Sequence, residues 1–234
     1  MKLDRRGRRS LKAGAFMAFS YLSTALALIA LVAILASLLV EGVGGLNLAV
    51  FTESTPPPGG EGGLANAIVG SLMLCAVAMV VAVVVGVLAG TWLAEYSCDS
   101  WYARVVRFVN DVLLSAPSIL IGLFVYQLLV APFGGFSGIA GCIALAVIVI
   151  PIVVRTTEDM LRLIPVALRE AAVALGTPQW KVIVMICYRA AKDGIVTGIL
   201  LAIARVAGET APLLFTSLGN LNWSLSLTKP MASL

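Results

Sequence analysis

The sequence lacks histidine and has little charge of either sign. Only 12% of its 234 residues are Asp, Glu, Lys or Arg, whereas soluble globular domains carry about 25%. So little charge cannot cover a water-facing surface, and a soluble fold is excluded. The absence of histidine removes the side chain that most often serves as general base or metal ligand.

Cysteine is also scarce, and its spacing indicates no site. The four cysteines lie far apart, without a Cys-x-x-Cys pair: Cys75, Cys98, Cys142 and Cys187. This spacing favours neither a disulfide framework nor a zinc site. We therefore expect no metal, no cofactor and no catalytic residue.

Long apolar stretches dominate what is present, since 60% of the residues are hydrophobic. A hydrocarbon core about 30 Å thick is crossed by roughly 20 apolar residues of helix. Runs of Val, Leu and Ala without alternation favour helices over a β-barrel. The sequence predicts an all-α integral membrane protein, a polytopic helical bundle. Its five transmembrane helices are expected at residues 13–40, 64–93, 112–130, 136–154 and 194–214.

Basic residues orient these spans, because Lys and Arg are retained on the cytoplasmic side of a membrane. All but Arg205 and Lys229 precede the first span or follow the second or fourth: Lys2, Arg5, Arg6, Arg8, Arg9, Lys12, Arg104, Arg107, Arg155, Arg162, Arg169, Lys181, Arg189 and Lys192. The charged residues of the first outer loop are all acidic: Glu41, Glu53 and Glu61. We predict a cytoplasmic N-terminus, with membrane lipid rather than nucleic acid around the chain.

This topology divides the chain into successive parts. They are a basic cytoplasmic N-terminus (1–12), the first transmembrane helix (13–40), a periplasmic loop (41–63), a helical core (64–214) with a cytoplasmic loop (155–193), and an outer C-terminal segment (215–234). Within the core, two glycine pairs have small-xxx-small spacing: Gly86 with Gly90, and Gly194 with Gly198. Such spacing predicts close contact between helices.

The cytoplasmic loop is expected to fold as a helix–glycine–helix elbow. Pro165 suits the first turn of one helix, and Gly176 can end it in a left-handed conformation. Thr177 is expected to cap a second helix with Pro178 at its first position. Four apolar residues share one face of the first helix: Leu168, Ala171, Ala172 and Leu175.

One pair of charges falls inside the last span. Arg205 and Glu209 are four residues apart, near mid-depth, although each buried charge costs about 2.5–3.5 kcal/mol on insertion scales. They could simply neutralise one another along the helix. However, Gly208 and Pro212 weaken the helix beside them, and broken helices line pathways. Since the planar Arg fork suits an oxyanion, the pair predicts an anion pathway.

Further polar residues near the span ends are open to two interpretations. Arg155 follows the helix-kinking Pro151 and could be an interfacial anchor or a second cation at the inner exit. Asp111 is interpreted as a topological boundary. Pro117 is expected to kink the span at 112–130.

The elbow carries a family resemblance. Glu170-Ala171-Ala172, with Gly176 four residues further and then Ile186, resembles the EAA loop of ABC importer permeases. The family often has Leu and Pro where Tyr188 and Arg189 stand. The resemblance implies that the elbow docks, as a coupling helix, into a cytoplasmic ATPase subunit. The residues it implies for this contact are Glu170, Ala171, Ala172, Leu175 and Gly176.

Further runs, at 93–97, 115–119, 151–158 and 203–212, resemble the PstA-type permeases of bacterial phosphate ABC transporters. With the EAA loop they cover about residues 64–234. The resemblance implies phosphate transport across the bacterial inner membrane, with a PstC-type second permease, a PstB-type ATPase dimer and a PstS-type periplasmic phosphate-binding protein. It implies a substrate pathway along Arg205, Glu209, Thr210 and Arg155. Family members continue through another helix after a segment like Lys229-Pro230-Met231, so the resemblance implies a sixth span that is absent from the 234 residues here.

The competing functions follow from the same residues. A permease for another oxyanion, such as sulfate or molybdate, would satisfy the charges equally well. A gradient-driven transporter or channel would place ionisable residues on several spans, and an intramembrane enzyme would need a nucleophile and a base. No phosphate-binding loop of the GxxxxGK type is present. The sequence therefore predicts a transport subunit, not an enzyme, with ATP hydrolysed by a partner.

Overall fold

The computed structural model describes residues 5–57, 59–60, 62–97 and 100–234. The expectations for Lys2, Glu61 and Cys98, and for the side chains of Arg5, Arg6 and Arg8, lie outside it. The described residues form helices and connecting segments without a β-strand, which confirms the all-α fold. They divide into two compact units, Met1–Leu48 and Ala49–Leu234, each described by itself.

The described part of the first unit is dominated by one long helix. Helix α1 runs over Arg5–Gly45 and contains the whole span expected at 13–40. Its side chains from residue 9 to residue 45, among them Phe19, Leu31 and Leu39, are exposed. A helix that is apolar on all sides is stable only in an apolar environment. This helix therefore has the composition of a membrane span.

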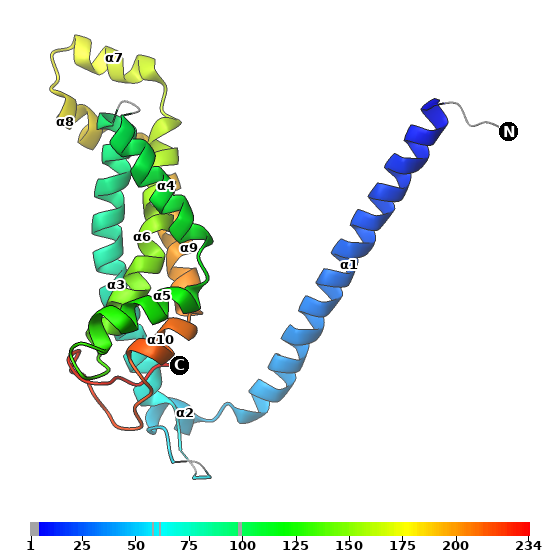
Figure 1. Ribbon diagram of the computed structural model, residues 1–234, viewed down its shortest axis with the longest axis vertical. Helices are drawn as coiled ribbons and strands as arrows, with labels where there is room; N and C mark the ends of the chain where they lie inside the picture. The colour runs from blue at the N-terminus through cyan, green and yellow to red at the C-terminus, as the bar shows by residue number, and fades with distance from the viewer. Residues whose placement is uncertain (1–4, 58, 61, 98–99) are drawn as a thin grey trace. The chain divides into compact units, whose positions relative to one another are not determined.

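The second unit holds the remaining helices (Figure 1). They are α2 (Leu48–Thr52, which begins one residue earlier), α3 (Ala65–Thr91), α4 (Trp101–Ser115), α5 (Ser118–Val125), α6 (Gly138–Arg162), α7 (Val166–Ala174), α8 (Gln179–Val182), α9 (Tyr188–Ala207) and α10 (Ala211–Thr216). Within the described residues of this unit, three π-helical turns continue helices: η1 (Trp92–Tyr96), η2 (Tyr126–Val130) and η3 (Ile183–Cys187).

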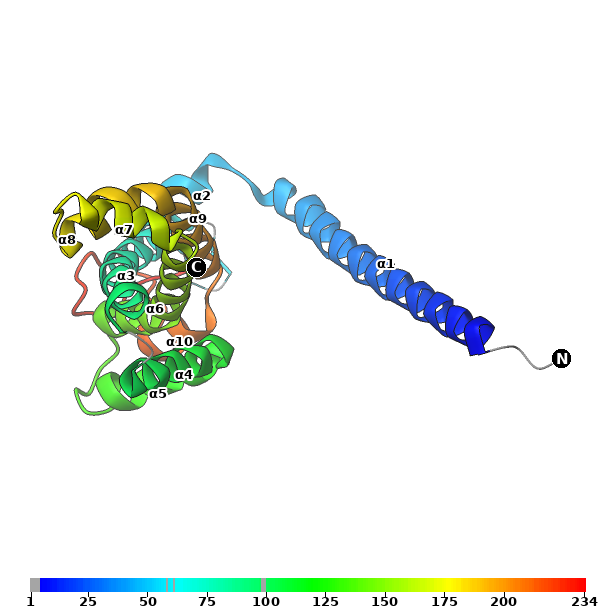
Figure 2. The same ribbon diagram turned by 90° about the horizontal axis from the view of Figure 1, so that it is seen from above.

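Helix α6 is the centre of this unit, with α3 and α9 packed against it (Figure 2). Its buried side chains include Leu145, Val149 and Val153, which lie in one cluster with Leu74 of α3 and Val206 of α9. The predicted glycine pairs make this contact close. A Cβ at Gly86 would lie 2.6 Å from Cβ of Val153, and one at Gly198 would lie 2.6 Å from Oγ1 of Thr156. The small-residue prediction is therefore confirmed.

Pro117 does more than kink its helix. The expected kink is a sharp bend, because α4 ends at Ser115 and Ser118–Val130 leaves it at 107°, so residues 112–130 do not form one continuous helix. The residue before a proline is driven out of the helical region, and Ala116 is extended there with ψ 135°. The new direction is set by packing, since a Cβ on Gly122 of α5 would lie 2.7 Å from Cα of Pro212 in α10.

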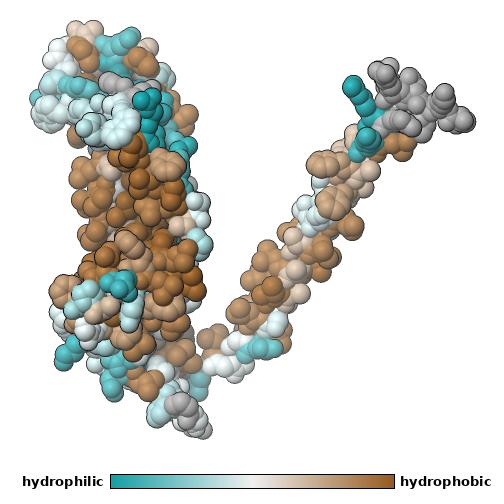
Figure 3. Space-filling model, in the orientation of Figure 1, coloured by the Kyte–Doolittle hydropathy of each residue, from teal (hydrophilic) through white to brown (hydrophobic). Residues whose placement is uncertain are grey.

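Three helical stretches of the described chain are long and apolar enough to cross a membrane: Arg9–Gly45, Ala65–Tyr96 and Gly138–Arg162. A fourth exists if α4 and Ser118–Val130 count as one bent span. In the second unit, apolar side chains cover the middle of the bundle and polar ones gather toward its ends (Figure 3). The count of five spans, the cytoplasmic N-terminus and the domain boundaries stay predictions.

The C-terminal segment, expected at 215–234, begins inside α10 and then lies against the ends of α3 and α6. The amide of Gly138 donates to the carbonyl of Lys229, and that of Ile139 to the carbonyl of Leu227. On α3, the buried Asn66 donates to the carbonyls of Asn220 and Leu221. These bonds fix an otherwise irregular segment to the helices.

The close contact between α3 and α6 predicts the effect of Gly90→Ala. Its Cβ would lie 2.7 Å from the carbonyl oxygen of Val154 and 2.8 Å from Cβ of Thr157, so the free energy of unfolding should fall by about 1–3 kcal/mol. Thermal denaturation in detergent micelles measures this. Gly14→Ala in α1 is the matched control, because nothing lies within 4 Å of its Cβ. Equal stability of the two variants would contradict the packing.

Candidate functional site

The predicted charge pair lies where α9 ends. Nε of Arg205 is 3.8 Å from Oε1 of Glu209, with the two side chains 47% and 16% exposed. This distance exceeds that of a hydrogen bond, so the two groups attract one another without being locked together. The pairing predicted from their spacing of four residues is confirmed.

The pair does not lie in the middle of a continuous helix, as the span expected at 194–214 implied. Helix α9 ends at Ala207, with Gly208 as its C-cap, and α10 begins only at Ala211. Pro212, next in the chain, lacks the N–H that would continue the helical ladder. Arg205 therefore stands in the last turn of α9, where a cation faces the negative end of the helix dipole.

Thr210 belongs to the same break. It is the N-cap residue of α10, and it lines a hollow with residues of α10 and of the C-terminal segment: Ala211, Leu214, Gly219, Ser233 and Leu234. The structure thus brings Arg205, Glu209 and Thr210 together at one interruption between helices.

Arg155 lies on α6, in contact with acidic residues rather than with the pair at the end of α9. Its Nε is 3.0 Å from Oδ2 of Asp159, and its Nη1 is 3.6 Å from Oδ1 of Asp111. Asp111, interpreted from sequence as a boundary, therefore joins α4 to α6. All three side chains are about half exposed, so each ion pair contributes about 0–1 kcal/mol.

The elbow is present with a correction to its second arm. Helix α7 ends as predicted, and Gly176 has φ +77°, in the left-handed region that favours glycine. Thr177 does not cap the next helix: Pro178 is the N-cap residue of α8, with an extended ψ of 146°. A residue before proline is itself held in extended conformations, so the helix begins later. Helix α8 continues through η3 into α9 instead of forming a separate short helix.

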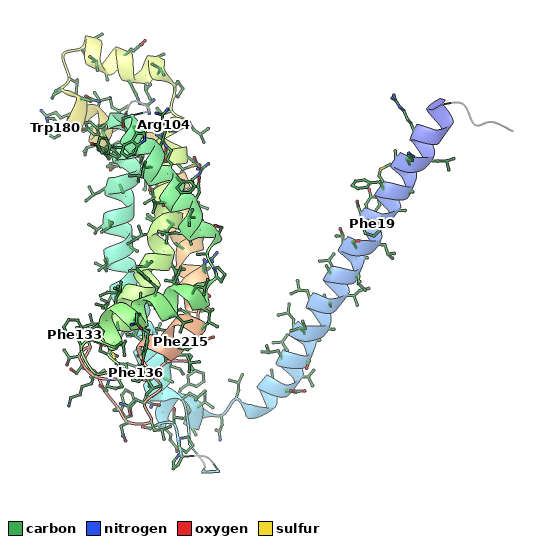
Figure 4. All side chains as sticks on the ribbon, in the orientation of Figure 1. Phe19, Arg104, Phe133, Phe136, Trp180 and Phe215 are labelled. Carbon is green, nitrogen blue, oxygen red and sulfur yellow. The ribbon has the colours of Figure 1, made fainter. Side chains whose placement is uncertain are left out.

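The apolar face expected on α7 is divided between burial and exposure. Ala172 is buried against α6 and α8, whereas Leu168 is 43% exposed and Leu175 is 87% exposed. Glu170 and Ala171 are also exposed. Figure 4 places Trp180 and Arg104 at this end of the unit, and Phe133, Phe136 and Phe215 at the other end. Helix α7 thus presents apolar side chains on the outside of the unit.

A buried carboxylate beside the elbow was missed by sequence reasoning. Glu158 of α6 is 4% exposed, with Nε of Arg107 at 2.7 Å and Nη2 of Arg162 at 3.0 Å. Arg107 also donates to the carbonyl of Leu93 and to Oγ of Ser97. The only local indication of this cluster in the sequence was the spacing of four residues between Glu158 and Arg162, which places both on one face of a helix. Arg107 was interpreted only as a topology signal, because nothing near it in sequence indicates its partner.

A second missed contact joins the elbow to the end of α3. Nη2 of Arg169 on α7 lies 2.7 Å from Oε1 of Glu95 in η1. The hydrogen bond to Glu95 raises the pKa of the Arg169 guanidinium. Three arginines counted as topology signals are thus also structural.

Comparisons with known proteins agree with this architecture. Residues 82–233 match the family described as "Binding-protein-dependent transport system inner membrane component". The phosphate transport system permease protein PstA of Yersinia pestis is 59% identical over 205 residues, which cover 87% of this chain and 70% of that protein. The protein of the same name in Haemophilus influenzae is 54% identical over 218 residues, covering 93% and 77%.

Among solved structures, an inward-facing form of the MetNI methionine ABC transporter is similar, with a TM-score of 0.56. The match covers 62% of this chain and 70% of that chain at 20% identity. At this identity the likeness shows the fold alone.

The burial of Glu158 predicts a large effect of Glu158→Gln. The neutral amide weakens the hydrogen bonds of both arginines, and the free energy of unfolding should fall by about 1.5–3 kcal/mol. Its neighbour supplies the control: Asp159→Asn removes a half-exposed carboxylate and should cost about 0–1 kcal/mol. Both are measured by thermal unfolding in micelles. A larger loss at Asp159 would contradict the burial argument.

Proposed function

The chain belongs to the family of binding-protein-dependent transport system inner membrane components. We propose that it is the permease through which inorganic phosphate crosses the bacterial inner membrane. It is a multi-pass inner-membrane protein and a component of a transport system. Phosphate is proposed because relatives that are 59% and 54% identical are phosphate transport system permease proteins. The Arg205 guanidinium adds a group whose planar fork suits this oxyanion.

The observation that carries the proposal of ATP-driven transport is the exposed face of α7. A short helix that ends at Ala174, two residues before Gly176, and exposes Leu168 and the following Leu175 offers a compact apolar surface to a partner. We assign this surface to docking with a cytoplasmic ATPase dimer of the PstB type. The contact residues proposed are Glu170, Ala171, Ala172, Leu175 and Gly176, with Ala172 acting from the buried side.

The transport cycle then uses the break between α9 and α10. ATP-driven closure of the ATPase dimer moves α7 and alternates access to a cavity shared with a PstC-type second permease. Phosphate, delivered by a PstS-type periplasmic binding protein, passes Arg205 while Glu209 exchanges partners, beside Thr210. It leaves past Arg155, whose acidic partners it displaces in part. The loose 3.8 Å contact of the pair supports this exchange, because little is lost when it opens.

Arg205→Gln tests the pathway. Loss of a charge-assisted contact to phosphate should lower uptake by about 10- to 100-fold, measured with labelled phosphate in vesicles that contain the assembled complex. Arg189→Gln is the matched control, an exposed arginine near the other end of α9. Undiminished uptake by Arg205→Gln would remove Arg205 from the pathway. Equal uptake of sulfate by the wild type would favour the broader oxyanion assignment.

Gly176→Val tests the docking of α7. A β-branched residue is strained at φ +77° and should displace the end of α7, so the amount of ATPase subunit that co-purifies should fall by about tenfold or more. Gly134→Val is the control, since Gly134 has a similar φ of +70° with nothing within 4 Å of its Cβ, in the loop beside Phe133 at the other end of the unit. Full recovery of ATPase with Gly176→Val would overturn the docking role.

A further inference from the structure

Helix α7 has few apolar contacts of its own to hold it in place. Ala172 is its only buried residue among those described, and a methyl group buries little area. Its connection to α8 passes through Gly176 and Pro178, outside regular helix. A helix held only in this way would move independently of the helices it has to displace.

Arg169 supplies the missing attachment to α6. Its Nη1 donates to the carbonyl of Ile164 and its Nη2 to the carbonyl of Leu161, both at 2.7 Å. Leu161 lies in the last turn of α6, and Ile164 lies two residues beyond its end. The carbonyls at the end of a helix lack the N–H partners that the following turn would provide. The guanidinium therefore caps α6 from α7.

The same guanidinium reaches α3 through Glu95. The ion pair at 2.7 Å is largely shielded from water, with Arg169 21% and Glu95 6% exposed. Glu95 lies in the π-helical turn η1, and such turns are frequent at functional sites because they shift side chains out of the α-helical register. The backbone carbonyl of Glu95 also accepts from Nε2 of Gln179, at the start of α8, at 3.5 Å. Both sides of the elbow therefore contact Glu95.

We infer that Arg169 and Glu95 are positioning residues that join α7 to the ends of α6 and α3, so that a displacement of α7 moves these helices with it. This inference rests on the proposed docking of α7 to an ATPase. It assigns to Glu95 a part in coupling although Glu95 lies 74 residues away from its partner, in a different helix. Neither residue contacts the break at Gly208, so they act on phosphate only through the helices.

The test separates ATP hydrolysis from transport in the assembled complex, reconstituted in vesicles with its binding protein. Glu95→Gln is the main variant, because it alters the ion pair without touching α7 or its exposed face. Arg169→Met leaves the Glu95 carboxylate buried without its cation, so it is combined with Glu95→Gln. Arg189→Met, at an exposed arginine of α9, is the control. Labelled phosphate taken up per ATP hydrolysed is measured for each.

We expect normal recovery of the ATPase subunit, basal hydrolysis within about twofold of wild type, and uptake per ATP lowered about tenfold in Glu95→Gln and in the double variant. The control should match the wild type. Uptake per ATP within twofold of wild type in both variants would overturn the inference. Loss of the ATPase subunit from both would also overturn it, since the contact would then serve folding or docking rather than transmission.

A second readout does not depend on transport. Amide hydrogen exchange over Val166–Ala174, measured in the same complexes, should be about tenfold faster in Glu95→Gln than in wild type and unchanged in Arg189→Met. Equal exchange in all three would overturn the attachment of α7. Failure of the proposed function itself is visible separately, because the wild-type complex would then take up no phosphate.

Discussion

The close approach of α3 and α9 to α6 is the constraint on which the other contacts of the bundle depend. Lipid tails are as apolar as the helices, so no hydrophobic force drives helices together within a membrane. Attraction must come from close packing and from polar contacts. Gly86 and Gly198 provide the first by bringing backbones against Val153 and Thr156 of α6. Only with these distances short can side chains from three helices meet at their ends.

Polar contacts supply the rest of the attraction between the helices. They concentrate at the end of the bundle that carries α7. Glu158 and Glu95 are both nearly inaccessible to water, and each is met by arginine. Because a buried carboxylate without a cation is strongly unfavourable, these contacts fix which helix ends lie together. The arginines that indicate topology in the sequence thus also stabilise the fold. A positive residue at a membrane boundary can do both.

Local features of the fold and site were predictable from the sequence because their causes are local. A glycine after an Ala-rich helix predicted the left-handed residue at Gly176, and the spacing of four predicted the pair of Arg205 and Glu209. The break near Gly208 was anticipated as a weakness, but not that the helix would end there. The start of α8 was predicted one residue too early, at Pro178. A proline restricts its own backbone and that of the residue before it, so Pro178 is the N-cap and the helix begins at Gln179.

Long-range features were not predictable in the same way. Arg107 and Glu158 are 51 residues apart, and no periodic pattern in a single sequence indicates which acid a given arginine will meet. The 107° bend after α4 was expected as a kink. Proline explains why the helix stops, whereas the new direction depends on how Gly122 of α5 fits against Pro212 of α10. That fit exists only once the chain has folded.

The carboxylate of Glu158 has a consequence for how this sequence can change over time. It serves arginines from two helices at once, Arg107 of α4 and Arg162 of α6. Replacing Glu158 leaves these two arginines facing one another without their shared carboxylate, and replacing both arginines leaves a carboxylate that water barely reaches without a cation. Changes at the three positions are therefore expected to be coupled. Related chains are expected to keep all three or to have exchanged them together, leaving a record of co-variation between α4 and α6.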